Sequence, residues 1–188
     1  MNRETRINNK LPLAREGFPF IFIGIGITVI FAFLGWTTLT VITSVITVFV
    51  IYFFRDPERH HPKEKNAVLT PADGRILEVK HVDEKDSPLG QPSIKVSIFM
   101  NVFNVHVNRI PIEGTIKKIA YHPGKFLSAD LDKASEQNEN NRITLETVDG
   151  REILVIQIAG LVARRIACWI DKGDTVKTGQ RFGLIRFG

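Results

Sequence analysis

The sequence has very little cysteine: Cys168 is the only one among its 188 residues. A single thiol can form no intramolecular disulfide and cannot supply the several thiolates of a structural zinc site. This composition fits a reducing compartment such as the cytoplasm. Dense basic clusters interleaved with aromatic residues are also missing, although the net charge is +5. We therefore expect no nucleic-acid partner.

Charged residues are absent from residues 17–54, whereas the rest of the chain is charged like an ordinary globular protein. A bilayer core takes roughly 20 helical residues, so two apolar helices fit this stretch better than one. We predict helices at 18–34 and 37–54, with Gly35 and Trp36 at the turn between them. The pattern predicts a transmembrane helical hairpin, with a re-entrant or shallow hairpin as the alternative.

Basic residues flank this hairpin on both sides. They are Arg3, Arg6, Lys10 and Arg15 before it, and Arg55, Arg59, Lys63 and Lys65 after it. Cytoplasmic loops of membrane proteins carry an excess of lysine and arginine. We therefore predict that the hairpin lies in the inner or cell membrane and that both flanks face the cytoplasm. The chain then divides into a cytoplasmic basic tail (1–16), the membrane hairpin (17–54) and a β domain facing the cytoplasm (55–188).

The part of the chain after residue 55 alternates apolar and polar residues, with frequent glycine and proline. This pattern predicts a mainly β barrel or sandwich. We expect strands at 67–70, 75–82, 94–100, 106–109, 114–120, 141–147, 152–159, 163–169 and 181–186. Residues 125–140 are polar and do not alternate, which predicts a loop or a short helix. The glycine spacing around Val176 is common in barrel-sandwich hybrid domains, where glycines form the tight turns and the valine fills the core.

Three places concentrate residues that could carry chemistry. They are Asp73 in TPADGRI, the FNVHVNRIP segment with Asn104, His106 and Arg109, and the terminal Gly188. Asp73 could equally cap its own turn, and a single histidine in a strand is more often structural. Asn104 and Arg109 offer an amide and a cation to an anionic ligand. The histidines are too widely spaced to suggest a metal site, and no Ser-His-Asp signature is present.

Several segments together resemble the phosphatidylserine decarboxylases in their shorter bacterial and archaeal form. They are PADG, FNVHVNRIP, YHPGKF, NENNR and GLVARRI followed by KGDTVKTGQRFGLIRFG. The resemblance implies that the chain is the β chain of a proenzyme that cuts itself after Gly188. A separate α chain, whose first residue has become a pyruvoyl group, would be its partner. That covalent cofactor would decarboxylate phosphatidylserine to phosphatidylethanolamine through a Schiff base. Membrane lipid is then a further partner, and homo-oligomerisation is left open.

The same resemblance implies roles for individual residues. Asp73 matches the aspartate that assists self-cleavage, and His106 matches the histidine of the decarboxylation step, where imidazole suits proton transfer near neutral pH. Arg109 departs from the family pattern, because longer members carry a second histidine there. Either another group supplies the base for cleavage or the arginine stabilises the oxyanion. Asn104, Arg109 and Lys125 are candidates for substrate binding, Lys125 as a phosphate contact, and no metal is expected.

A membrane-tethered carrier or adaptor without catalysis is the alternative, because lipoyl and biotin carriers have the same hybrid architecture. The tripeptide at residues 132–134 resembles the lipoyl-lysine pattern. It precedes the Gly173-Asp174 motif, however, whereas a carrier places its lysine on the hairpin that follows such a motif. A decarboxylase for a soluble amino acid is a second alternative, which the apolar hairpin disfavours.

Overall fold

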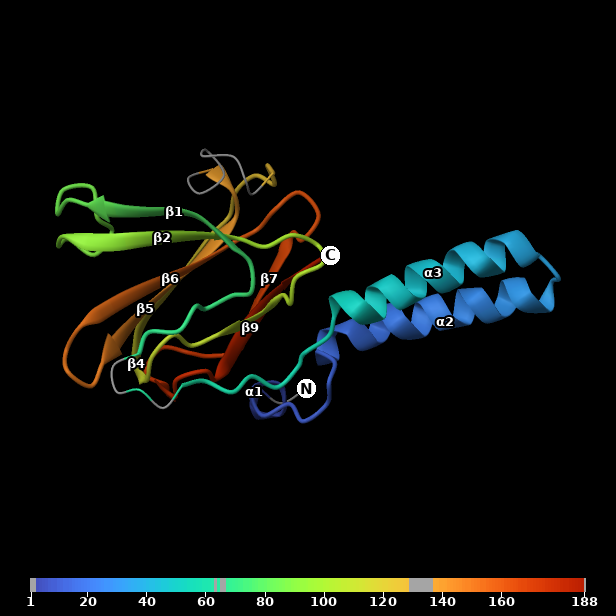
Figure 1. Ribbon diagram of the computed structural model, residues 1–188, viewed down its shortest axis with the longest axis horizontal. Coiled ribbons are helices and arrows are strands. Elements are labelled where there is room, and N and C mark those ends of the chain that lie inside the picture. Colours follow the sequence, from blue (N-terminus) through green and yellow to red (C-terminus); the bar gives the residue numbers. More distant parts are fainter. Residues whose placement is uncertain (1–2, 63, 65–66, 129–136, 188) are drawn as a thin grey trace. The chain divides into compact units, whose positions relative to one another are not determined.

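The computed structural model describes residues 3–62, 64, 67–128 and 137–187 (Figure 1). The chain divides into two compact units, Asn2–Glu58 and Arg59–Gly188. All of the named strands lie in the second unit, which confirms the mainly β prediction for that part of the chain. The first unit contains the helices α1 to α3.

The apolar stretch of the first unit folds into two antiparallel helices (Figure 1). A short helix α1 (Glu4–Ile7) and a 3-10 turn (Arg15–Gly17) precede α2 (Phe18–Phe33) and α3 (Thr37–Phe53). Both predicted helices are therefore present, each ending one residue earlier than expected. Gly35 turns the chain between them with φ of 72°. L side chains seldom adopt this left-handed conformation, so a glycine is required there.

The two helices touch each other along a narrow seam and expose most of their apolar side chains. A Cβ at Gly24 would lie 2.6 Å from the Thr47 hydroxyl, so only glycine allows this approach. Side-chain hydroxyls on α3 donate hydrogen bonds to backbone carbonyls one turn earlier. The Thr47 hydroxyl, for example, donates to the Thr43 carbonyl at 2.7 Å. The helical run Arg15–Phe33 is long and apolar enough to cross a bilayer, whereas α3 has only 17 residues. One membrane-length helix is present, and the predicted double span is not confirmed.

The two ends of the helix pair are joined at its base. Leu13 and Arg55 form an antiparallel bridge, and the Ala14 N–H donates to the Phe54 carbonyl at 2.7 Å. The buried carboxylate of Asp56 accepts a hydrogen bond from the Asn9 amide at 3.1 Å. The segment before the helices and the segment after them therefore lie side by side.

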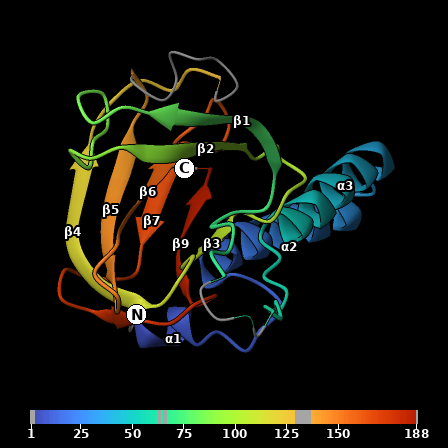
Figure 2. The same cartoon turned by 60° about the vertical axis from the view of Figure 1, so that its left-hand side comes forward.

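The second unit contains three antiparallel sheets. The first is a ribbon of β1 (Arg75–Val82) and β2 (Ser93–Phe99). The second has the order β3–β9–β7, with β3 (Val107–Arg109), β9 (Arg181–Arg186) and β7 (Arg165–Cys168). The third has the order β6–β5–β4–β8, with β6 (Glu152–Ile158), β5 (Asn140–Thr147), β4 (Gly114–His122) and β8 (Thr175–Val176). Figure 2 shows the curvature of β4 and β5, which gives this sheet the form of a half-barrel.

Two strand predictions need correction. Residues 67–70 form no strand, because the Ala67 N–H donates to the Glu64 carbonyl at 3.4 Å and the Leu69 N–H to the Pro111 carbonyl at 2.8 Å, and neither bond belongs to a strand ladder. The two-residue strand β8 was not predicted, since its pairing with Gly114 and Thr115 leaves no periodic pattern. Half of the segment predicted as a loop or short helix at 125–140, residues 129–136, lies outside the described residues. Its ends meet at a bridge between Lys125 and Asn138.

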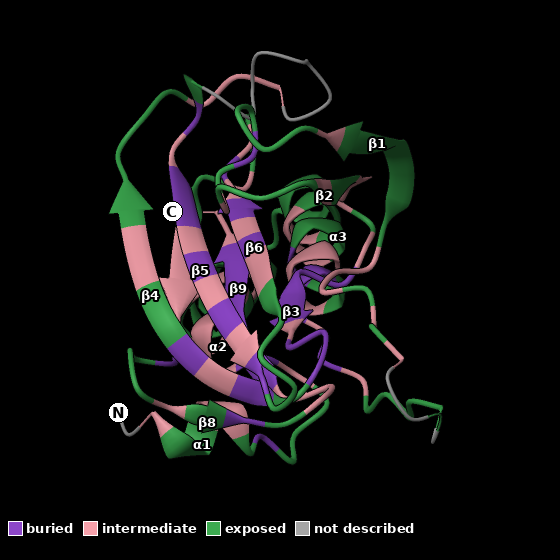
Figure 3. Cartoon of the chain, turned by 90° about the vertical axis from the view of Figure 1, so that its left-hand side faces the viewer, coloured by how far each residue is buried: buried purple, intermediate pink, exposed green. Residues whose placement is uncertain are grey.

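The core of the second unit lies between the two larger sheets. β5 alternates buried and half-buried residues, whereas five of the six residues of β9 are buried (Figure 3). The buried apolar side chains include Ile116, Ile143, Leu145, Val176, Phe182 and Leu184. Val176 therefore fills the core as predicted from the glycine spacing. The glycines at 173 and 179 have positive φ, as that pattern requires.

Candidate active site

His106 lies immediately before β3 and beside the C-terminal half of β9. The ladder pairs Val107 with Leu184, and the His106 carbonyl accepts a hydrogen bond from the Ile185 N–H at 3.2 Å. The His106 side chain is only 3% exposed. Val105 and Val107 are buried as well, so this segment is covered on both of its faces. A buried imidazole is therefore held next to the end of β9.

A backbone contact fixes the state of the imidazole. His106 Nδ1 lies 3.0 Å from the Asn104 carbonyl oxygen. A carbonyl only accepts, so this hydrogen bond requires the proton on Nδ1. In the neutral ring the lone pair then lies on Nε2. The chain thus presents Nε2 as the nitrogen that can accept and deliver a proton.

Asn104 belongs to a tight turn before His106. Its side-chain oxygen accepts the Asn101 N–H at 2.8 Å, and the Asn101 side chain accepts the Phe103 N–H at 2.9 Å. These bonds fix the turn whose Asn104 carbonyl orients the imidazole. Asn104 therefore holds the position of His106 through its backbone, in addition to the substrate contact expected from the sequence.

Asp73 lies in the turn before β1, where it does not cap its own turn. Its carboxylate forms an ion pair with Arg59, and both side chains are partly exposed. The adjacent Gly74 approaches β2 closely, because a Cβ there would lie 2.3 Å from the Phe99 carbonyl oxygen. The Pro71 carbonyl accepts the Arg109 N–H at 2.9 Å. The turn that carries Asp73 is thus attached to β3 at Arg109, three residues after His106.

Arg109 is half-buried at the irregular end of the β3–β9 ladder. Its guanidinium donates to the Gly179 carbonyl at 3.1 Å, which fixes the turn that leads into β9. Across the ladder it pairs with Arg181, a buried arginine that the sequence analysis did not single out. Arg109 therefore connects the turn before β9 with the turn that carries Asp73. A direct contact with a substrate stays a prediction.

The other two candidates lie apart from this group in what the structure describes. Lys125 is exposed after β4, and its ammonium donates to the Gln137 side chain at 3.3 Å. No contact with His106 or Asp73 is seen for it among the described residues. Gly188 lies outside the described residues, as does the tripeptide 132–134 of the carrier alternative.

A chain of buried amides behind β9 was missed by the sequence analysis. Gln157 on β6 donates to the Asn108 side chain at 2.9 Å and accepts from the Asn141 side chain at 3.0 Å. All three side chains are buried. Gly183 on β9 lets β7 approach closely, because a Cβ at this position would lie 2.3 Å from the Ala167 carbonyl oxygen. The chain links β3, β5 and β6 and so fixes the strand beside His106 against the larger sheet.

Three groups outside the candidate residues have shifted pKa values. A hydrogen bond with Glu139 raises the pKa of Tyr121, and burial raises the pKa of the Cys168 thiol. Hydrogen bonds from Arg151 and Thr147 lower the pKa of Asp149 to about 2. Asp149 lies in the turn between β5 and β6, where it fixes the hairpin rather than a reaction site.

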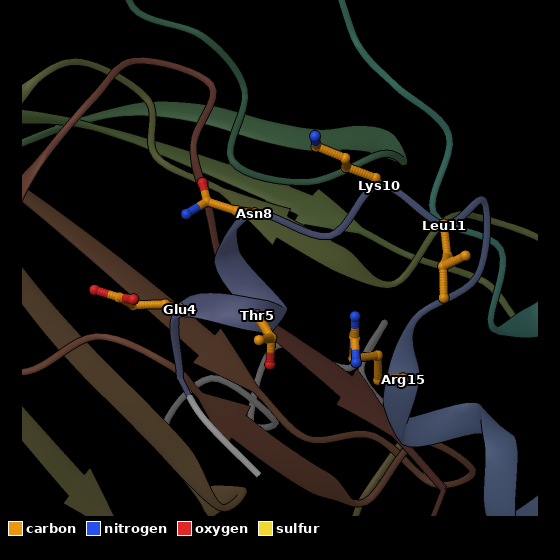
Figure 4. A pocket seen from close by; sticks show the side chains of 6 residues that line it. All are labelled: Glu4, Thr5, Asn8, Lys10, Leu11 and Arg15. Carbon is orange, nitrogen blue, oxygen red and sulfur yellow. The ribbon is translucent and has the colours of Figure 1, made fainter.

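Two surface depressions are lined by residues other than the candidates. A depression of about 450 Å³ in the first unit is lined by residues of α1 and of the segment after it, which Figure 4 shows as sticks. A second one lies at the turn between β1 and β2. Within the described ranges, no cluster of three or more histidine, cysteine or acidic residues could hold a metal ion.

Comparison with known proteins gives one consistent result. The family model described as phosphatidylserine decarboxylase matches residues 46–188. The phosphatidylserine decarboxylase proenzyme of Syntrophus aciditrophicus is 54% identical over 94% of this chain and 83% of its own length. The corresponding proenzymes of Desulfotalea psychrophila (50% identical, 95% and 83%) and Ralstonia nicotianae (48% identical, 97% and 85%) are similar over nearly the same extent.

Proposed function

Because the chain belongs to the phosphatidylserine decarboxylase family, we propose that it is the β chain of a self-cleaved proenzyme with its active site beside His106. The activity is decarboxylation of phosphatidylserine, and the enzyme is a pyruvoyl-dependent carboxy-lyase. This activity favours the decarboxylase interpretation of the sequence over the carrier alternative. The cut after Gly188, the separate α chain and the residue roles are the proposed parts.

The pairing of His106 with the end of β9 is the observation that carries the proposal. The ladder places His106 beside Ile185, and three further residues reach at most about 11 Å. In the uncut precursor, the residue after Gly188 is therefore confined to within about 15 Å of the strand position that pairs with His106. The residues present fit a pyruvoyl group in this region, because a buried imidazole lies beside the end of β9 with its Nδ1 bonded to the Asn104 carbonyl.

The proposed mechanism divides the work between the cofactor and the protein. A bound pyruvoyl group supplies a carbonyl that withdraws the electron pair left on the substrate when carbon dioxide leaves. His106 supplies the proton. With protons on both ring nitrogens, it donates the Nε2 proton to the substrate carbon, while its Nδ1–H stays hydrogen-bonded to the Asn104 carbonyl. The surrounding buried valines exclude bulk water from the imidazole. Decarboxylation therefore ends with a proton on the carbon that lost the carboxylate.

We assign self-cleavage to Asp73, as the family resemblance implies. In that reaction the hydroxyl of a serine after Gly188 would lose its proton and attack the Gly188 carbonyl, and the peptide C–N bond between them would break to leave an ester. β-Elimination would then free the Gly188 carboxylate, and hydrolysis of the remaining dehydroalanine would release ammonia and leave the pyruvoyl group. A carboxylate is the kind of base that can accept or relay the hydroxyl proton. The ion pair with Arg59 orients the Asp73 carboxylate, and the Pro71 contact with Arg109 attaches its turn to β3. Arg109 then supports the site through the backbone, and it stays a candidate for substrate binding together with Asn104 and Lys125.

The first unit is proposed to anchor the enzyme in the inner or cell membrane, with the β unit facing the cytoplasm. Three features support this placement: one membrane-length helix, exposed apolar side chains such as Phe33, and a substrate that is a lipid. The Leu13–Arg55 bridge joins the two ends of the helix pair, which supports a placement with both ends on one side of the membrane. A barrel-sandwich hybrid is the architecture proposed for the β chain and the α chain together.

Intact-mass analysis of the purified full-length proenzyme tests the cut and the Asp73 assignment together. We expect two polypeptides, one ending at Gly188 and a small one whose N-terminus is blocked and bears a carbonyl. Asp73→Ala should leave a single uncut chain. Asp83→Ala, an exposed carboxylate at the end of the ribbon, is the matched control and should be cut normally. Normal cutting of Asp73→Ala would refute its role, and a single chain in the unaltered protein would refute the cut.

A further inference from the structure

The β1–β2 ribbon is the most exposed secondary structure of the second unit. Seven of the eight residues of β1 are exposed (Figure 3). Among the described strands the ribbon is hydrogen-bonded to no other sheet. It is held at its ends, where Gly74 meets the Phe99 carbonyl and Ser87 bonds Ser93 at 2.9 Å.

The register of the ribbon separates two different faces. Directly paired residues share a face of a sheet, and the faces alternate along each strand except at a bulge. An irregularity between Ile76 and Glu78 shifts the register of β1, so Ile76 lies on the same face as Val79. The pairs Val79–Val96, His81–Ile94 and Ile76–Ile98 lie on one face. The pairs Glu78–Ser97 and Lys80–Lys95 lie on the other. One face is therefore apolar and the other is polar, as in a sheet that has one side covered.

The apolar face is left open to solvent. Ile76, Val79 and Ile94 are each about 60% exposed, and Val96 is 49% exposed. A two-stranded ribbon is marginally stable in water unless its apolar face is covered. Contiguous exposed apolar surface of this kind marks an interaction site. A further partner is therefore needed to cover this face.

The matched proenzymes contain sequence that can supply such a cover. The similarity to the first relative covers 94% of this chain but only 83% of the relative. The remaining 17% of that relative is roughly 35 residues, enough for several strands of ordinary length. Since the ribbon has two open edges as well as an open face, an added segment could extend it by strand pairing.

We propose that the α chain of the proenzyme covers the apolar face of the β1–β2 ribbon, formed by Ile76, Val79, Ile94, Val96 and Ile98. This inference rests on the proposed two-chain function, and it assigns the α chain its docking surface on the β chain. The ribbon continues directly from the turn that carries Asp73. Docking on the ribbon therefore also connects the α chain to the residue proposed to assist its formation.

A second copy of the chain and membrane lipid are the rival occupants. A second copy would place Lys80 and Lys95, already paired across the ribbon, near a further pair of lysines if the two ribbons joined edge to edge. Lipid would suit the apolar residues but would leave the two open strand edges without partners. An α chain docked here covers the apolar face with its own apolar side chains and also pairs with the open strand edges.

Photo-crosslinking in the full proenzyme tests this surface. A benzophenone amino acid replaces Val79 in one variant and Lys80, its neighbour on the opposite face, in the matched control. After irradiation in native membranes, we expect a product with the combined mass of the β and α chains from position 79. Its yield should be at least fivefold higher than from position 80, and peptide mapping should place the link in the α chain.

The outcomes separate the docking surface from the cleavage. A link from position 79 to a second β chain or to lipid, or equal yields at the two positions, would overturn the docking proposal. If the protein is not cut, the link is mapped within the single chain. A link to residues after Gly188 would then support the docking surface while refuting the cleavage, and a link elsewhere would refute both.

Discussion

Two antiparallel strand pairs of the second unit both contain apolar residues and yet are buried to opposite degrees. In the β3–β9 pair, Val107, Asn108 and five residues of β9 are buried. In the β1–β2 pair nearly every residue of β1 is exposed. The difference lies in what faces each pair. The amides of Gln157 and Asn141 tie the first pair to the half-barrel, whereas the second pair has no sheet bonded beside it among the described strands.

This difference assigns the two pairs different tasks. A pair whose neighbours fix it on all sides can hold an imidazole in one tautomer and one orientation, as catalysis requires. An exposed pair cannot do so by itself, but it can receive a partner. The reaction is therefore expected to depend on β3–β9, and assembly on β1–β2.

The largest expected effect comes from replacement of the histidine beside the buried pair. His106→Gln should reduce release of carbon dioxide from phosphatidylserine about 10³-fold, because positioned acid–base catalysis contributes on this order. Self-cleavage should continue, so the α chain should still form. His122→Gln, exposed at the end of β4, is the control and should keep activity within about twofold of the unaltered enzyme, since neither a catalytic nor a docking role is assigned to it. Headgroup-labelled substrate measures the rate, and turnover by His106→Gln would remove His106 from the mechanism.

A medium effect is expected from the amide that anchors the buried pair. Gln157→Leu leaves the Asn108 oxygen and the Asn141 amide without their partner. Each buried unsatisfied polar group costs about 1–3 kcal/mol, so we expect a loss of about 2–4 kcal/mol and a lower Tm. Glu78→Gln, on the polar face of the ribbon, is the control and should change stability by less than about 0.5 kcal/mol. Thermal melts of the two variants compare them, and equal Tm values would show that the amide chain does not fix β3.

The smallest effect is a pH dependence at the turn between β5 and β6. The pKa of Asp149 is lowered to about 2 from its ordinary 3.8, with Arg151 and Thr147 as hydrogen-bond donors. A lowered pKa means that the carboxylate stabilises the fold fully above pH 3.8 and loses this contribution as the pH falls toward 2. The carboxyl carbon signal in NMR should titrate near pH 2. In Asp149→Asn, the free energy of unfolding should no longer change with pH through this group. An NMR titration midpoint of Asp149 near 3.8 in the unaltered protein would contradict the turn geometry.

Alternation in the sequence was sufficient to locate most strands but not to place them in sheets. Residues 75–82 and 181–186 were predicted with their observed bounds, yet one strand is exposed and the other is buried. A period of two identifies the two faces of a strand, but which face is covered depends on contacts between distant residues. The failed strand at 67–70 shows the same limit, since Leu69 has an apolar side chain but no neighbouring ladder.

The candidate site shows a similar division. His106 was predicted as a strand residue that points away from its neighbouring valines; it is buried but lies one residue before β3, and the family resemblance supplied its proposed role. The chain of Asn108, Gln157 and Asn141 left no sequence signal, because the three residues are far apart and amides occur throughout polar segments. Their partnership depends on the register of three strands, which sequence alone does not fix.

The central position of β9 has a consequence for how the proposed cut would proceed in time. Hydrogen bonds to β3 on one edge and to β7 on the other hold the strand at Leu184 and Ile185. The residues that follow it therefore meet the groups near His106 at a fixed local concentration, whatever the concentration of protein. Self-processing should follow first-order kinetics, and dilution of the precursor should leave its half-time unchanged.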